Sequence, residues 1–229
     1  AGWKLGESTH TDLPLALAQA GAYIEQRGSS FDSYLKLFRA ERQRLWKSEG
    51  AMEEKKTVAT TWELNMSRIQ AENPRAASIL YRMAYYSADK IPGRLLQHAL
   101  DDWRKGGGNK SDAMVELEFG DDIQALTRYS LISGKSGMYN IHRLVQSVIQ
   151  DRLEAEKCHL TTFVECIAGL QLEFKYDPDD PASWKTVAPL IAHVEALGSH
   201  QLATEARGHD LGAMMNGAGD YIRRVESNL

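Results

Sequence analysis

The chain has 229 residues, of which 43% are hydrophobic and 25% are charged, and its formal net charge is −4. These proportions are ordinary for a globular protein, so they argue against a wholly disordered chain. A small negative net charge provides no general attraction to nucleic acids or to acidic membrane surfaces. We therefore expect no membrane partner, and a nucleic-acid partner is disfavoured unless a local basic face exists.

The sequence predicts a cytoplasmic protein. No apolar run approaches the roughly 20 residues that cross a bilayer, and residues 1–10 lack the apolar stretch of a signal peptide. Cys158 and Cys166 are eight residues apart in a helical-looking stretch, and this spacing is too long for a disulfide bond. We expect both thiols to be reduced, as they are in a reducing compartment.

The first part of the chain, residues 12–104, is predicted to be a helical bundle. Apolar residues recur at helical spacing, and glycine, serine or proline separates the helices. Asp12 and Pro14 mark the start of the first helix, and Asn73 and Pro74 open the fourth as its cap and first residue. The expected helices are 13–24, 31–46, 58–70, 74–86 and 92–104, with a polar connector at 47–56.

A run of glycines at 106–108 predicts a linker, and the pattern changes after it. Two short helices, a β-hairpin and a longer helix follow one another, and this order is typical of a winged-helix domain, here over 110–156. The expected helices are 112–119, 121–129 and 142–156, and the hairpin consists of 130–133 and 138–141 around a turn at 134–137.

Residues 157–229 are predicted to be helical again. Asp180 and Pro181 open a helix that runs to about residue 197, and Pro189 is expected to bend it. Small residues within 211–222 allow two helices to pack closely, as in tetratricopeptide hairpins. The other expected helices are 161–174 and 203–225. The predicted fold class is therefore mainly α.

No motif for catalysis or metal binding is complete in this sequence. Gly134-Lys135-Ser136 matches the end of a phosphate-binding loop, but the motif requires glycine where Tyr129 stands. The histidines are scattered without the spacing of a zinc site, and no nucleophile elbow is present. We expect no catalytic residue, no metal site and no enzyme activity in this chain.

Two segments together resemble a known family. The segment 13–17 (Leu-Pro-Leu-Ala-Leu) looks like the Gly-Leu-Pro-Leu-Ala motif of NB-ARC proteins, the STAND signalling ATPases of the apoptotic and plant-resistance (NLR-like) type. The segment 139–146, which contains His142, resembles the histidine-bearing motif at the end of their winged-helix domain. Residues 58–64 and 91–92 are similar to the helical domain of fungal and bacterial members, which commonly carry tetratricopeptide repeats. Residues 157–229 look like the helical spacer of those members and the start of a tetratricopeptide-like array.

The resemblance implies a nucleotide-dependent regulator. A nucleotide-binding domain, missing from this chain, would precede it and hold ADP or ATP with Mg²⁺. Leu13 and Pro14 would lie near the adenine, and His142 would approach the β-phosphate of ADP. The implied partners are that domain in cis, further copies of the protein on activation, and a protein ligand bound by the C-terminal repeats. This chain alone is expected to bind no nucleotide tightly.

The motifs also depart from those of the family. Asp12 replaces the usual glycine before Leu-Pro, and Arg143 replaces the aspartate that follows the histidine in plant relatives. Pro14 also has a simpler interpretation as a proline at a helix start, and His142 as a capping or core histidine.

Two other functions are compatible with the sequence. A winged-helix DNA-binding regulator would insert the helix 121–129 into the major groove, but Asp121 and Asp122 would repel phosphate there. A plain helical adaptor of the tetratricopeptide type would show no response to adenine nucleotides.

Overall fold

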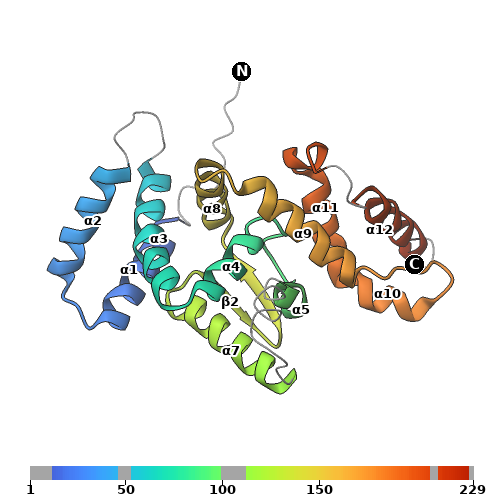
Figure 1. The fold of residues 1–229 in the computed structure, drawn as a ribbon, viewed down its shortest axis with the longest axis horizontal. Coiled ribbons are helices and arrows are strands. Elements are labelled where there is room, and N and C mark those ends of the chain that lie inside the picture. Colours follow the sequence, from blue (N-terminus) through green and yellow to red (C-terminus); the bar gives the residue numbers. More distant parts are fainter. Residues whose placement is uncertain (1–11, 46–52, 99–111, 207–210, 227–229) are drawn as a thin grey trace.

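The computed structural model describes residues 12–45, 53–98, 112–206 and 211–226. Within these ranges the chain is mainly helical with one small antiparallel sheet, which confirms the predicted fold class. Figure 1 shows the first three helices at one end of the molecule, the sheet in the middle and the last helices at the other end. One cluster of buried apolar side chains runs from Tyr23 to Ala218 and connects all three parts.

The N-terminal helices pack around α3, whose Trp62 and Met66 side chains are fully buried. Asn73 caps α4 as predicted, because its Oδ1 accepts a hydrogen bond of 3.1 Å from the Ala76 N–H and Pro74 is the first helical residue. The four helices of this part are α1 (Asp12–Arg27), α2 (Phe31–Leu45), α3 (Glu53–Glu72) and α4 (Pro74–Met83).

The predicted connector at 47–56 is wrong in its second half, because α3 already begins at Glu53. Its lysines and glutamates are good helix formers, so a charged stretch extends the helix instead of interrupting it. The first half of the connector lies outside the described residues.

A single helix, α7 (Asp112–Arg128), replaces the two short helices predicted for 112–129. Gly120 does not break it, because a glycine costs a helix only about 1 kcal/mol. Asp122 is buried, and it accepts hydrogen bonds from Asn73 Nδ2 at 2.6 Å and from Arg75 Nη2 at 3.1 Å. These contacts tie α7 to the start of α4 and give the buried Asp122 a structural role.

The predicted hairpin is confirmed. Strands β2 (Ile132–Lys135) and β3 (Met138–Ile141) pair antiparallel, and the turn between them consists of Ser136 and Gly137. Both turn residues have positive φ, 54° and 76°, a backbone that matches the twist of a two-residue hairpin. The turn is therefore shorter than the predicted 134–137, whose first two residues belong to β2.

A third strand, β1 (Ile91–Pro92), pairs with the other edge of β3, so the strand order is β1-β3-β2. The helix predicted for 92–104 is wrong at its start, because Pro92 is extended and α5 (Gly93–Gln97) begins after it. Gly93 donates a hydrogen bond of 2.8 Å to the Gly137 carbonyl, which holds the start of α5 against the hairpin. The end of that predicted helix and the glycine linker at 106–108 lie outside the described residues.

The C-terminal part is helical, as expected. Asp180 caps α10 by accepting a 2.9 Å hydrogen bond from the Ala182 N–H, and Pro189 lies in a 3₁₀ turn that interrupts the predicted helix near its middle. The elements are α8 (Arg143–Ala155), α9 (His159–Glu173), α10 (Pro181–Val187), η2 (Ala188–Leu190), α11 (Ile191–Ser199), η3 (Gln201–Thr204) and α12 (Leu211–Glu226).

The single helix predicted for 203–225 is wrong, because a 3₁₀ turn, η3, precedes α12. His200 starts that turn, and its Nδ1 accepts a hydrogen bond of 3.2 Å from the Leu202 N–H. α12 then packs against α11 and α9. The boundaries 12–104, 110–156 and 157–229, and the names winged helix and tetratricopeptide array, stay predictions.

Candidate functional site

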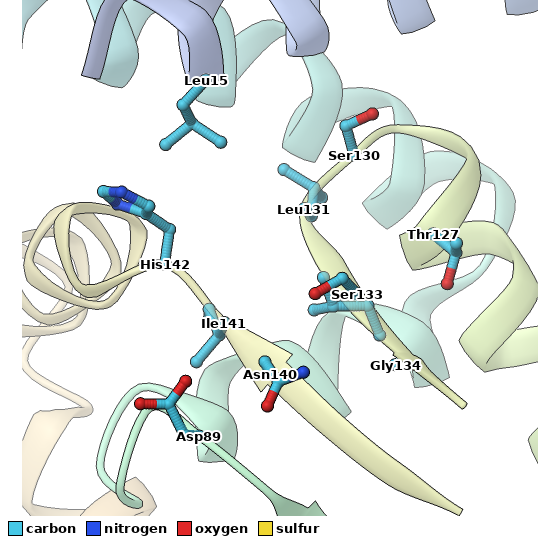
Figure 2. A pocket seen from close by; sticks show the side chains of 11 residues that line it. Leu15, Asp89, Thr127, Ser130, Leu131, Ser133, Gly134, Asn140, Ile141 and His142 are labelled. Carbon is cyan, nitrogen blue, oxygen red and sulfur yellow. The ribbon is translucent and has the colours of Figure 1, made fainter. Parts of the chain in front are cut away.

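A pocket of about 610 Å³ opens between the start of α1, the end of α7, the hairpin and the start of α8 (Figure 2). Its wall combines aliphatic side chains with hydroxyl, amide, carboxylate and imidazole groups. The lining residues are Leu15, Asp89, Thr127, Ser130, Leu131, Ile132, Ser133, Gly134, Asn140, Ile141 and His142. A volume of several hundred cubic ångströms is in the range of small-molecule sites.

The end of α7 positions the first side of the pocket. Ser130 adopts φ 53°, and the Leu131 N–H donates a 3.1 Å hydrogen bond back to the Leu126 carbonyl. Ser130 thus adopts the left-handed conformation that glycine usually adopts at a helix end, and the chain then enters β2. Ser130 and Leu131 thereby reach the pocket wall.

A turn at 88–90 forms the second side, and β3 holds it in place. The Ile141 N–H donates to the Ala88 carbonyl at 2.9 Å, and Asn140 Oδ1 accepts from the Lys90 N–H at 2.8 Å. Lys90 has φ 55°, a backbone that is unfavourable for a lysine and that these two bonds stabilise. Asp89, between the two bonds, lines the pocket.

His142 lies at the N-terminus of α8, where it is the capping residue. Its Nδ1 accepts a hydrogen bond of 3.2 Å from the Leu144 N–H. An imidazole nitrogen that accepts carries no hydrogen, so the ring proton of His142 is on Nε2. The side chain thus presents an N–H donor next to the backbone N–H groups of a helix start, which is an environment that favours an anion.

The structure brings the two family-like segments 13–17 and 139–146 together at this pocket. Leu15 from the segment 13–17 and His142 both line it. Pro14 lies in the first turn of α1, but it is exposed and does not line the pocket. Leu13 also belongs to the first turn of α1, and its side chain lies outside the described part of the molecule.

Sequence reasoning missed most of the polar wall, in particular Asp89, Ser130 and Asn140. Asp89 reaches the pocket because of the two-residue strand β1 that follows it, and such a strand has no detectable periodicity. Asn140 belongs to the 139–146 motif, but no sequence pattern indicates that its side chain binds the Lys90 N–H.

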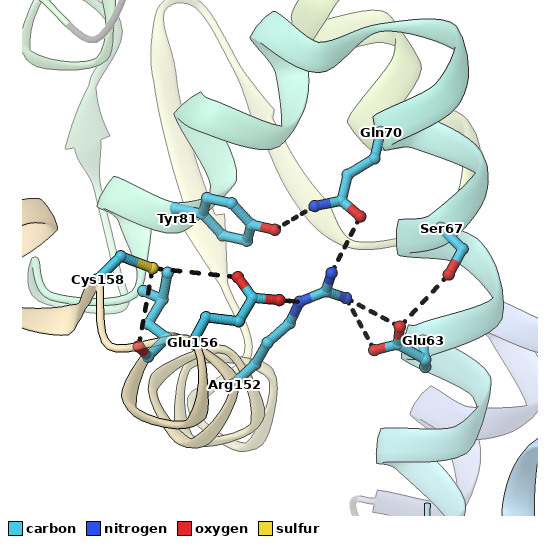
Figure 3. A network of polar contacts seen from close by, with 8 residues as sticks. Glu63, Ser67, Gln70, Tyr81, Arg152, Glu156 and Cys158 are labelled. Carbon is cyan, nitrogen blue, oxygen red and sulfur yellow. Dashed lines mark hydrogen bonds and ion pairs between the residues drawn. The ribbon is translucent and has the colours of Figure 1, made fainter. Parts of the chain in front are cut away.

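The far end of α8 is anchored by Arg152, which fixes the helix that carries His142 (Figure 3). Arg152 Nη1 donates to both carboxylate oxygens of Glu63 in α3, each at 2.9 Å. Arg152 also donates to Gln70 Oε1 at 3.0 Å and to Glu156 Oε1 at 2.8 Å. These bonds engage all three nitrogens of the guanidinium and tie α8 to α3.

Two glutamines of α8 add a second anchor. Gln146 Nε2 donates to the carbonyls of Met83 and Tyr86, at 2.9 and 2.8 Å, and Gln150 Nε2 donates to the Ala84 carbonyl at 2.6 Å. The end of α4 is thereby capped by side chains from α8, because these carbonyls have no helical partner.

The described residues contain no group of three or more His, Cys, Asp or Glu side chains arranged to hold a metal ion. Within the same ranges, no helix is both long and apolar enough to span a bilayer. Burial raises the pKa of Cys166 to about 12, so this thiol is not a thiolate at neutral pH.

Comparison with known proteins gives a family model and a curated relative that each match part of this chain. Residues 67–158 match the family described as Domain of unknown function (DUF7779), a range that includes every pocket residue except Leu15. The chain is 29% identical over 162 residues to a protein of Hyaloscypha variabilis named "Nucleotide-binding leucine-rich repeat (NLR)-like protein". That match covers 63% of this chain and 14% of the relative, so the chain spans a small part of the relative's length. No solved structure matches the chain. These similarities are consistent with an NLR-like family.

Proposed function

We propose that this chain is the regulatory helical part of an NB-ARC-type signalling protein and forms one side of its ADP site. The observation that carries the proposal is the shared pocket of Leu15 and His142, which come from segments far apart in the sequence. Both segments resemble motifs that face the nucleotide in that family. A preceding nucleotide-binding domain in cis would supply the phosphate-binding loop and Mg²⁺.

The pocket offers different chemistry at its two ends. Figure 2 shows Leu15 and His142 at one end and Asp89 at the other. The Nε2–H of His142 and the start of α8 favour a phosphate, whereas the Asp89 carboxylate repels one. Leu15 and Leu131 give an apolar wall for a base. A diphosphate is therefore expected at the end of the pocket that contains His142.

The proposed role is regulation rather than catalysis. ADP bound between the two halves favours a closed resting state, and its exchange for ATP shifts the population towards an open state that oligomerises. The C-terminal helices α9–α12 would bind the protein ligand that triggers exchange. In this proposal the chain contributes no catalytic group.

Calorimetry on the full-length protein tests the proposal with ADP as the titrant. His142→Ala should weaken ADP binding by about 1–3 kcal/mol, the range for a lost hydrogen bond to a charged group. His159→Ala, which alters a half-buried histidine of α9 outside the pocket, serves as the control and should bind as the wild type does. Equal affinities for wild type and His142→Ala would refute the role of His142, and no ADP binding at all would favour a plain adaptor.

A further inference from the structure

The turn at 88–90 lies between the pocket and the C-terminal helices. On the pocket side, β3 holds it through the Ile141 N–H to Ala88 and the Lys90 N–H to Asn140. On the opposite side, His193 of α11 approaches the Lys90 carbonyl, with its Nε2 at 3.3 Å from that oxygen. The sheet therefore binds the N–H of Lys90, and α11 binds its carbonyl.

Histidine is an unusual residue type for the buried position 193. His193 is fully buried and its ring packs edge-on against Tyr86, with ring centroids 5.7 Å apart and planes at 74°. A carbonyl can only accept, so Nε2 carries the proton and Nδ1 is an acceptor. Among the described residues, Nδ1 has no hydrogen-bond partner. A leucine or phenylalanine would fill this site without leaving a buried acceptor unsatisfied.

A polar group that is buried at a cost in stability is typical of a position where its hydrogen bond has a functional role. His193 bonds to Lys90. Lys90 directly follows Asp89 in the sequence, and its N–H is bonded to the Asn140 side chain. Asp89 and Asn140 both line the pocket. Burial lowers the pKa of His193 to about 4, so the ring is neutral at physiological pH and can serve as this donor.

We propose that His193 is a positioning residue, which fixes the turn at 88–90 and thereby couples the placement of the C-terminal helices to the shape of the pocket. The proposal stands on the geometry of the turn and goes beyond the proposed nucleotide role. A partner that displaces α11 would release the Lys90 carbonyl, and Asp89 would move with it.

Other contacts attach the C-terminal helices independently of this bond. Arg94 of α5 donates to the Thr186 carbonyl at 2.8 Å and forms an ion pair with Glu173 at 2.9 Å, and His98 contacts the same carboxylate at 2.7 Å. Loss of the His193 bond alone should therefore leave α9–α12 in place. Its effect should be local to the turn.

Amide hydrogen exchange of the 229-residue chain, resolved by NMR, tests this coupling. His193→Phe keeps an aromatic ring beside Tyr86 and removes the donor, and we expect the amides of Ile141 and Lys90 to exchange about fivefold faster, the factor for one lost hydrogen bond. His193→Gln, whose amide nitrogen can replace Nε2, should restore slow exchange.

Two further variants make the result specific. Leu197→Ala removes a buried side chain from the same helix without removing a donor. The exchange rates of the Ile141 and Lys90 amides should then rise no more than those of the amides that exchange by global unfolding. If His193→Phe does not fold, His193→Asn replaces it, because the shorter amide cannot reach the Lys90 carbonyl. Unchanged exchange in His193→Phe, or in His193→Asn where that variant replaces it, would overturn the proposal, and so would an equal acceleration in Leu197→Ala.

ADP binding separates this proposal from the proposed function. In the full-length protein, His193→Phe should also weaken ADP affinity, while His193→Gln should not. If ADP does not bind to the wild type, the nucleotide role fails and the exchange measurement still decides the role of His193.

Discussion

The ion pair between Arg152 of α8 and Glu63 of α3 should contribute much more to stability than an exposed pair within α3. Side-chain exposure is 19% for Arg152 and 14% for Glu63, and Arg152 Nη1 lies 2.9 Å from each Glu63 oxygen. The guanidinium also lies over the Trp62 ring, 5.6 Å from its centroid. The pair formed by Arg68 and Glu72 is a natural comparison, with exposures of 39% and 48%.

The expected magnitude follows from the environment of each pair. Two charges about 4 Å apart attract by about 4 kcal/mol at an effective dielectric constant of 20. Desolvation and side-chain ordering offset part of that attraction for Arg152 and Glu63, which leaves a coupling energy of about 2 kcal/mol. An exposed helical pair such as Arg68 and Glu72 gives about 0.3–0.5 kcal/mol.

Double-mutant cycles measured by urea denaturation separate the two cases. One cycle uses Arg152→Met and Glu63→Gln, and the other uses Arg68→Met and Glu72→Gln. High salt should reduce the Arg68 coupling and leave most of the Arg152 coupling intact, because buried charges are screened less. A coupling energy for Arg152 and Glu63 no larger than that of the exposed pair would refute this reasoning.

Two other predictions concern the pH dependence of stability and the hairpin. Burial lowers the pKa of His193 from 6.5 to about 4, so the unfolded state binds the proton first, and about 3 kcal/mol of stability should be lost as pH falls from 6.5 to 4. Urea denaturation across this range should show a shallower loss for His193→Gln than for the wild type, and equal slopes would contradict the assignment. Gly134→Ala should destabilise the chain by about 3 kcal/mol or more, because a side chain there would lie 2.3 Å from the Met138 carbonyl oxygen. Gly137→Ala should cost only about 1 kcal/mol by thermal denaturation, since it meets no atom within 4 Å and is disfavoured by its positive φ alone; equal losses at both glycines would count against the close approach at Gly134.

Helix starts could be predicted from the sequence because neighbouring residues determine them. Asn73 with Pro74, and Asp180 with Pro181, mark helix starts that the structure confirms, because a cap involves only neighbouring residues. The hairpin was also predictable, although its turn is shorter than expected, since Ser136 adopts a positive φ that its residue type does not favour.

Long-range contacts decided the elements that sequence reasoning missed. Asp122 is held by Asn73 and Arg75 across α4, and no local pattern reports such a partner. The same limit applies to the pocket. Motif resemblance singled out His142, but Asp89 joins it because β3 binds Ala88 and Lys90, the two neighbours of Asp89.

Photoaffinity labelling of the full-length protein tests the nucleotide site most directly. We propose 8-azido-ADP, whose reactive group sits on the base, with the labelled peptides identified by mass spectrometry. The account predicts labelled peptides from this chain that contain the apolar wall at Leu15 or Leu131, and excess ADP should suppress the label. Labelling that excess ADP suppresses only in other parts of the protein, with none in the peptides that contain pocket residues, would contradict it.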